Sequence, residues 1–374
     1  MTESKNGGMS DMANVIDYIE WRGDLTFEKS PFCEVDNLLL STAAFIDFQG
    51  IVSADPWGMP VKLSVSAERY REKYPEGRYY GVVMPADIET VFYKMAKSPR
   101  FRDIYLTCYI SDLNETEGKQ FGAVTMVLPD NSIFISYRGT DDTITGWRED
   151  FNLSFTFPVP SQKAAVEYLE TVASFHRGGI RLGGHSKGGN LAVYAAAMCR
   201  EEFQGRIINA YSNDGPGFMA EFIESDEFRA VEERVVTYVP QSSVVGMLLS
   251  HSEAVHVIES DRPLGIQQHD PLSWKVLGTS FVHLDNLSDI GLIHKDGFRR
   301  ILDGMNTERR RRFTDIVFQI IEATEAKTLT ELSEAKLKNA MIMLRAYNEL
   351  DREGKEEIRE FIRSLAVMGA DTKK

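Results

Sequence analysis

A serine within a glycine-rich heptapeptide is the residue of this sequence best suited to act as a nucleophile. Ser186 stands in Gly183-Gly184-His185-Ser186-Lys187-Gly188-Gly189, which contains the pattern Gly-x-Ser-x-Gly. A serine of this kind sits on a strained turn between a strand and a helix, where neighbouring side chains must be small. Ile180 to Leu182 before it favours a strand, and Asn190 to Ala197 after it favours a helix. We therefore predict a nucleophile elbow at Ser186.

Two other interpretations apply to the same heptapeptide. It can be a turn that only connects a strand to a helix, or a loop that holds phosphate at a helix N-terminus. Neither Gly-x4-Gly-Lys-Ser/Thr nor Gly-x-Gly-x-x-Gly fits the residues around Ser186, which speaks against the phosphate loop.

A serine nucleophile needs a histidine base, a carboxylate that orients the base, and N–H donors for the oxyanion. In α/β hydrolases the chain order is Ser, Asp/Glu, His, so the base must follow Ser186. His269 lies in a polar loop after a late strand, where such a base belongs, whereas His256 lies in a strand-like run and is expected to be structural. The candidates in this part of the chain are His251, His256, His269, His283 and His294.

Four segments between about residues 100 and 280 resemble the class 3 lipases, the fungal-type triacylglycerol lipase group. Gly184 to Ala192 resembles the lipase elbow Gly-His-Ser-Leu-Gly-Gly-Ala-Leu-Ala. Ile135 to Thr140, followed by Trp147 and Asp150, resembles the Arg-Gly-Thr/Ser and Trp-x-x-Asp segment ahead of it. The other two segments are Asn213 to Gly217, which stands where the family has a Gly-x-Pro turn, and His269 to Trp274, which resembles the family's His-then-Trp segment. The likeness is greatest to a bacterial branch of lipase-like proteins whose function is not established.

The resemblance assigns the base and part of the oxyanion hole. It implies that His269 is the catalytic histidine and that Thr140 is one oxyanion donor. The other donor is expected to be the backbone N–H of Lys187, the residue after the nucleophile. Trp147, Asp150 and Arg138 are expected to brace the loop that carries Thr140.

The acid is where the sequence departs from the resemblance. Class 3 lipases carry it after the strand that matches Val235 to Val239, but here the following loop, Pro240 to Gly246, contains no carboxylate. Asp214 follows the preceding strand, and we predict that it takes this role because parallel strands end at the same edge of a sheet. Asn213-Asp214-Gly215 is also good turn chemistry, so Asp214 can instead be a simple turn former. Asp270 is a distant third candidate.

The elements that must position these residues alternate between strands and helices. This alternation predicts an α/β-hydrolase fold with a mostly parallel central sheet and helices on both faces. Residues 129–131 form a turn, so the strands on either side are expected to be antiparallel. We expect strands at 105–110, 122–128, 132–137, 179–183, 207–212, 234–239 and 254–258, and helices at 162–176, 189–200 and 218–230.

The chain divides into three expected segments. Residues 1–100 read as mainly helical and pack on the core or cover the site, 101–295 form the catalytic core, and 296–374 form a C-terminal helical extension. In the extension, helices are expected at 312–326, 331–350 and 355–367. Arg309 to Arg312 is a basic run, interpreted as a solvated helix face with a partner or an anionic surface as the alternative.

Composition narrows the class of protein. Hydrophobic residues make up 43% and charged residues 26% of the 374 residues, which fits an ordinary folded protein. A formal net charge of −14 argues against a dedicated nucleic-acid binder. The cysteines Cys33, Cys108 and Cys199 show no disulfide or zinc spacing, so no cofactor or metal is expected. No signal-peptide-like or membrane-spanning stretch is visible, so a cytoplasmic location is expected.

These observations predict a serine hydrolase that cleaves a carboxylic, lipid-like ester through an acyl-enzyme intermediate. The expected partner is a small-molecule or lipid ester, and the C-terminal helices are a candidate surface for contact with a partner or a membrane. A non-catalytic hydrolase-like scaffold and a serine peptidase or amidase on the same fold are the alternatives.

Overall fold

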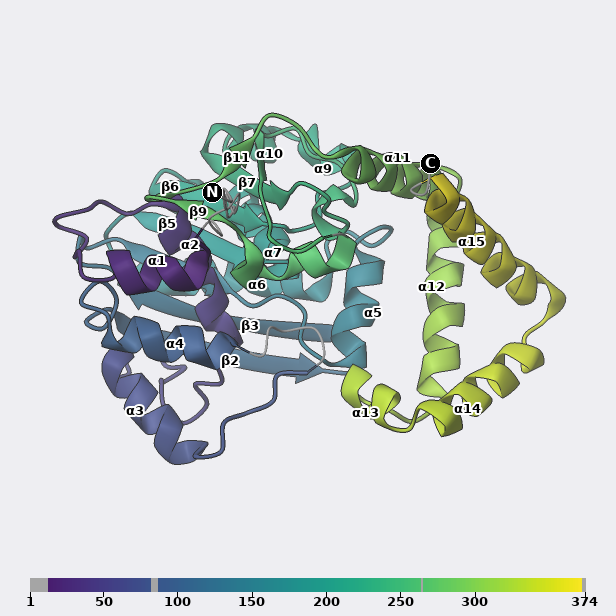
Figure 1. Cartoon of the computed structure of the whole chain (residues 1–374), viewed down its shortest axis with the longest axis horizontal. Coiled ribbons are helices and arrows are strands. Elements are labelled where there is room, and N and C mark those ends of the chain that lie inside the picture. Colours follow the sequence, from purple (N-terminus) through teal and green to yellow (C-terminus); the bar gives the residue numbers. More distant parts are fainter. Residues whose placement is uncertain (1–12, 82–86, 264, 372–374) are drawn as a thin grey trace, which may run out of the picture.

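A nine-stranded sheet organises the part of the chain that the computed structural model describes, residues 13–81, 87–263 and 265–371 (Figure 1). Within this sheet the strands lie side by side in the order in which they occur along the chain. Strands β9 and β10 are not part of it and form a separate two-stranded hairpin. The strands are β1 (Val61–Lys62), β2 (Tyr105–Asn114), β3 (Lys119–Val127), β4 (Ile133–Tyr137), β5 (Ile180–His185), β6 (Ile207–Asn213), β7 (Val235–Pro240), β8 (Val255–Ile258), β9 (Val276–Leu277), β10 (Ser280–Phe281) and β11 (His283–Leu284).

Strands β4 to β8 run parallel to one another, and antiparallel strands flank them on both sides. The turn at 129–131 joins β3 to β4 as an antiparallel pair, as predicted, with Ala123 opposite Tyr137. Every residue of β4 is buried, as is usual for a strand covered on both faces. Because β4 to β7 are parallel, the segments that follow Tyr137, His185, Asn213 and Pro240 all lie at one edge of the sheet.

Helices cover both faces of the sheet, and side chains alternate between two cores. Phe134 of β4 packs in a core with residues of α1, α2 and α4, whereas Ile133 and Ile135 pack in a second core with α6 and α7. This alternation follows from the two-residue period of a strand. The helices of the first 260 residues are α1 (Val15–Arg22), α2 (Glu34–Thr42), α3 (Leu63–Lys73), α4 (Ile88–Lys97), α5 (Ile144–Asn152), α6 (Pro160–Phe175), α7 (Lys187–Met198), α8 (Glu201–Gln204), α9 (Ala220–Ile223) and α10 (Asp226–Arg229), with single 3-10 turns at Ala43–Phe45, Glu232–Arg234 and Val245–Met247.

The C-terminal residues form a group of helices beside the sheet edge, drawn in green to yellow in Figure 1. Helix α12 is attached to α5 by Arg148, which pairs with Asp315 and Glu322 at 2.8 Å each. An isolated β-bridge also joins Thr143, just before α5, to Thr328, just before α13. The helices of this group are α11 (Asp289–Asp303), α12 (Thr307–Glu322), α13 (Leu329–Glu334), α14 (Lys336–Glu349) and α15 (Arg352–Asp371). The 3-10 helices η4 (Gly265–His269) and η5 (Pro271–Ser273) come earlier, between β8 and β9.

The architecture is an α/β-hydrolase fold, with the mixed but centrally parallel sheet and two helical layers that the sequence predicts. The helix expected at 218–230 is wrong in detail, because Ser225 caps a new helix there and splits it into α9 and α10. The helix expected at 331–350 is likewise two helices, α13 and α14. Among the described residues, no helix has the length and apolar character needed to cross a bilayer.

Candidate active site

Ser186 lies on a sharp turn between β5 and α7. Its backbone has φ 60° and ψ −134°, a strained conformation for a residue with a side chain. The turn is so tight that a Cβ on Gly184 would lie 2.2 Å from the Gly188 carbonyl carbon. The Ser186 N–H donates to the Asn213 carbonyl at the end of β6, at 3.0 Å. The sequence thus folds locally into the elbow geometry that exposes a serine hydroxyl at the sheet edge.

His269 and Asp214 meet at this edge. His269 Nδ1 and Asp214 Oδ2 are 2.6 Å apart, and Asp214 is fully buried. The other carboxylate oxygen, Oδ1, accepts the Ser243 hydroxyl and the Gly246 N–H, the latter at 3.1 Å. The loop after β7 therefore supplies no carboxylate, but it supplies two donors that hold the carboxylate of the neighbouring strand.

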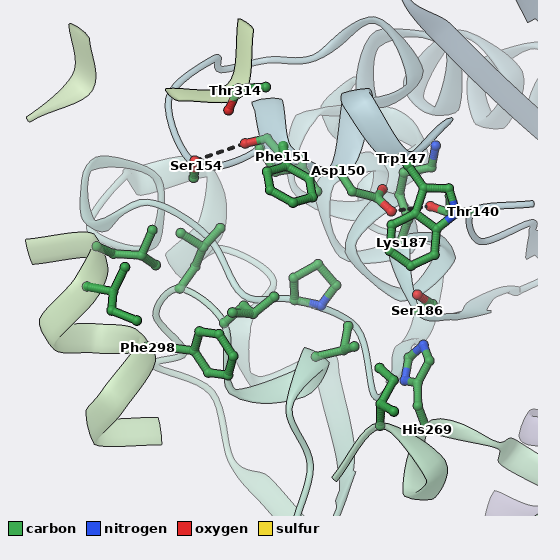
Figure 2. Close-up of a pocket in the computed structure, with 18 of the residues that line it drawn as sticks. Thr140, Trp147, Asp150, Phe151, Ser154, Ser186, Lys187, His269, Phe298 and Thr314 are labelled. Carbon is green, nitrogen blue, oxygen red and sulfur yellow. Dashed lines mark hydrogen bonds between the residues drawn. The ribbon is translucent and has the colours of Figure 1, made fainter. Parts of the chain in front are cut away.

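The His269 imidazole is directed toward Ser186 (Figure 2). Within the described residues no direct hydrogen bond joins the Ser186 hydroxyl to the His269 imidazole, and both side chains line the same cavity. The His269 ring also contacts the His185 ring in a tilted arrangement, with ring centroids 4.4 Å apart. Burial, and then the proximity of His269, hold the pKa of His185 well below its usual value. The neutral His185 ring donates from Nε2 to the His269 carbonyl at 2.7 Å, which fixes the segment that carries the base.

Thr140 and Lys187, the two expected sources of oxyanion N–H groups, line the same cavity as Ser186. In the part of the chain that the structure describes, neither the Thr140 N–H nor the Lys187 N–H has a hydrogen-bond acceptor. The Thr140 loop lies against the elbow because its preceding residue is glycine: a Cβ on Gly139 would lie 2.4 Å from the His185 carbonyl oxygen and 3.2 Å from Ser186 Cβ. The arrangement can hold an oxyanion between the two loops.

Asp150 anchors the Thr140 side chain. The Thr140 hydroxyl donates to Asp150 Oδ2 at 2.6 Å, whereas Oδ1 is shielded from solvent and has no hydrogen-bond partner. Burial raises the pKa of Asp150 to about 6, and the Lys187 ammonium and the Thr140 hydroxyl limit that rise. Trp147 lines the same cavity one turn earlier on α5. Arg138 pairs with Asp141 at 3.5 Å on the far side of this loop.

Of the five candidate histidines, His269 is the one that lines the cavity beside Ser186 in the described part of the chain. His251 binds Glu253 and the Gly246 carbonyl, at 2.8 and 2.9 Å. His256 is exposed on β8, and His283 pairs with Glu34. Asp270 caps η5 and faces Arg262, away from His269 Nδ1.

A cavity of about 790 Å³ opens beside Ser186 and extends toward the C-terminal helices (Figure 2). Ser186, Thr140 and His269 lie at one end, and Phe298 of α11 and Thr314 of α12 lie at the other. Most of the lining is apolar, and much of it comes from α11, α12, α15 and the turn between α11 and α12: Phe298, Ile301, Leu302, Met305, Phe313 and Phe361. Within the described residues, no group of three or more His, Cys, Asp or Glu side chains is placed to hold a metal, and the cysteines are free.

Sequence reasoning missed several residues that shape this site. Asn37 of α2 donates to the Asn213 side chain at 2.8 Å, so the N-terminal segment braces the residue before Asp214. The apolar residues of α11 and α12 carried a periodic signal, but no pattern indicated that they would face Ser186. Ser243 and Gly246 lie in the loop that lacks a carboxylate, and no pattern in the sequence indicated that they would donate hydrogen bonds to Asp214.

Comparisons with known proteins give one family match and distant likenesses to solved structures. No curated protein matches the chain. Among solved structures, the Rhizomucor miehei lipase–propeptide complex is 18% identical over 54% of this chain and 67% of that chain, with a TM-score of 0.35. A triacylglycerol lipase from Penicillium expansum is 14% identical over 50% of this chain and 84% of that chain, with a TM-score of 0.30. Such distant likenesses carry no inference about substrate. A family model described as Mbeg1-like matches residues 95–319, which include Thr140, Ser186, Asp214 and His269, and the chain belongs to this Mbeg1-like family of lipase-like proteins.

Proposed function

We propose that the protein is a serine hydrolase that cleaves carboxylic esters with an apolar acyl group. The observation that carries this proposal is the convergence of Ser186, His269 and Asp214 at one sheet edge, beside two backbone N–H groups without acceptors. The lipase-like fold is consistent with an ester hydrolase.

The proposed reaction begins with attack of Ser186 Oγ on the ester carbonyl. His269 takes the hydroxyl proton at Nε2, and Asp214 stabilises the resulting imidazolium through Nδ1. The Thr140 and Lys187 N–H groups donate to the oxyanion. His269 then protonates the leaving alcohol, and an acyl-enzyme remains. Water, deprotonated by His269, attacks the acyl-enzyme and releases the acid together with free Ser186.

The cavity supports an apolar acyl group as the part of the substrate that the protein recognises. Phenylalanine and aliphatic side chains line the end away from Ser186, so an alkyl chain there would leave water for apolar surroundings. Because α11, α12 and α15 form that wall, we propose that the C-terminal extension supplies the acyl pocket.

Labelling with a fluorophosphonate probe and hydrolysis of nitrophenyl esters test the proposal directly. We expect the wild type to be labelled and to cleave esters, and Ser186→Ala to do neither. Ser154→Ala is the matched control, because Ser154 also lines the cavity but donates its hydroxyl to the Phe151 carbonyl. Cleavage of nitroanilides but not of nitrophenyl esters would identify the protein as an amidase. Absence of both labelling and turnover would favour the non-catalytic scaffold instead.

We also propose that α14 contacts an anionic lipid surface. Leu337, Met341 and Leu344 are 85%, 67% and 60% exposed and share one face of the helix at i, i+4 and i+7 spacing. Within the described residues, the nearby cations Lys336, Lys338 and Arg345 form no ion pair. An apolar stripe flanked by unpaired cations is typical of helices that lie in a membrane interface.

A further inference from the structure

The Lys187 side chain is a buried cation directly beside the candidate nucleophile. The resembling lipase elbow has leucine at this position, whereas Lys187 is only 1% exposed. Its ammonium donates three hydrogen bonds: to Gln120 Oε1 at 2.7 Å, to Glu149 Oε2 at 2.9 Å and to the Gln120 carbonyl at 3.0 Å. A buried ammonium is stable only when it is paired and all its N–H groups are used, as they are here.

Glu149 and Gln120 complete the network. Glu149 is fully buried, and its carboxylate accepts the Gln120 N–H at 3.2 Å as well as the Ser161 N–H at the start of α6 at 2.8 Å. The carboxylate thus lies at a helix N-terminus, where a negative charge is favourable. The pair is therefore anchored to β3, α5 and α6 together.

Both ends of the network reach the loop that carries Thr140. Gln120 Nε2 donates to the Gly139 carbonyl at 3.4 Å. Glu149 is followed in α5 by Asp150, which accepts the Thr140 hydroxyl at 2.6 Å. The network therefore includes the side chain of Lys187, which supplies one oxyanion N–H. It also holds the loop of Thr140, which supplies the other N–H.

We infer that the Lys187–Gln120–Glu149 network is a positioning device that sets the separation of the two oxyanion donors. This inference rests on the proposed hydrolase function. Donors must lie within hydrogen-bonding distance of an oxyanion that exists only along the reaction path, so a small change in their separation lowers turnover while substrate still binds. A leucine at position 187 would leave Glu149 and Gln120 without their shared partner.

The test uses Lys187→Met/Glu149→Gln, which removes both charges and so avoids an uncompensated buried ion. Gln120→Leu is a second variant that keeps the ion pair but loses the side-chain bonds to Gly139 and to the Lys187 ammonium. Thr125→Val is the matched control: Thr125 is buried on the same strand and bonds Tyr168 instead of the oxyanion loop. Turnover is expressed per fluorophosphonate-titrated site, so that misfolded protein does not count.

We expect the double variant and Gln120→Leu to lose at least tenfold in kcat, with KM within about twofold of wild type, and Thr125→Val to keep its kcat. A trifluoromethyl ketone, which forms a tetrahedral oxyanion on the serine, should lose affinity by the same factor as kcat. Variants with wild-type kcat and ketone affinity per titrated site, whatever their melting temperature, would overturn the inference. An inactive, unlabelled wild type would instead refute the hydrolase function itself.

Discussion

Asp214 orients His269 from the end of β6, and the loop after β7 holds Asp214 in turn. The His269 Nδ1 to Asp214 Oδ2 distance is 2.6 Å, while Ser243 and Gly246 bind the other carboxylate oxygen. The backbone of Asp214 has φ 52°, in the left-handed region that aspartate tolerates better than most residues. The ends of two neighbouring parallel strands, β6 and β7, thus lie close to the same imidazole.

Asp214→Asn is expected to reduce turnover by about 10⁴-fold with little change in KM. The asparagine amide would face His269 Nδ1 as a donor and favour the wrong imidazole tautomer. Steady-state kinetics with a soluble nitrophenyl ester would measure this loss, with circular dichroism to show that the fold persists. Ser243→Ala is the graded control, because the Gly246 N–H still binds Asp214. Near-normal turnover in the asparagine variant would assign the acid role to another residue.

Asp150 should make the stability of the protein depend on pH. Burial raises its pKa to about 6, above the usual value of 3.8, so the folded state binds this proton more tightly than the unfolded state. The Asp150 contribution to stability is therefore present below about pH 4 and is lost as pH rises through 6. At 1.36 kcal/mol per unit, the loss is up to about 3 kcal/mol, reduced by whatever water reaches the carboxylate from the cavity.

Asp150→Asn removes this titration and keeps an acceptor for the Thr140 hydroxyl. Urea unfolding of both proteins at pH 4 and pH 7 should show the asparagine variant gaining stability relative to wild type as pH rises. Other titrating groups are common to both proteins and cancel in the difference. A constant difference across this range would mean that Asp150 ionises normally in the folded state.

The sequence predicted the core of the fold because its strands and helices carry strong periodic signals. Helix α7 is an example: Ala192, Ala195 and Ala196 predict a helix packed closely on a sheet, and all three are fully buried. The residues adjoining the elbow were also predictable, because a strained strand-to-helix turn requires small neighbours on either side of Ser186. The choice of Asp214 followed from the rule that parallel strands share an edge, whereas His269 was assigned by the resemblance to class 3 lipases.

Contacts between distant segments were not predictable in this way. The Lys187 side chain reaches Gln120 and Glu149 across three elements, and no spacing in the sequence signals that contact. The same holds for the C-terminal helices, whose apolar faces indicate burial without indicating the partner. The division at 218–230 depends on one local capping residue, Ser225, which competes with an otherwise continuous helical pattern.

Filling the far end of the cavity should change the preferred length of the acyl chain. Thr314 of α12 is buried and lines the cavity opposite Ser186, so Thr314→Phe would occupy space meant for the chain. We expect kcat/KM for a long-chain nitrophenyl ester to fall at least tenfold, because even one displaced methylene is worth about 1–3 kcal/mol in a fitted pocket. Acetate and butyrate esters should be cleaved as before. Thr307→Phe, on an exposed position of the same helix, is the control; an unchanged chain-length profile in Thr314→Phe would place the acyl group elsewhere.

The exposed stripe of α14 should bind anionic vesicles. Each cation near an anionic surface contributes about 1 kcal/mol, and the apolar side chains add the hydrophobic term. Leu337→Glu/Met341→Glu is expected to lower partitioning onto phosphatidylglycerol vesicles at least tenfold in a sedimentation assay, and Lys336→Gln/Lys338→Gln/Arg345→Gln should remove its salt sensitivity. Neither variant touches the cavity lining, so hydrolysis of a soluble ester should persist.

Leu113→Glu/Leu277→Glu, which changes two exposed leucines on strands, is the matched control and should bind like wild type. If all these proteins partition equally, or if wild type binds no vesicles, α14 is not a lipid-binding surface.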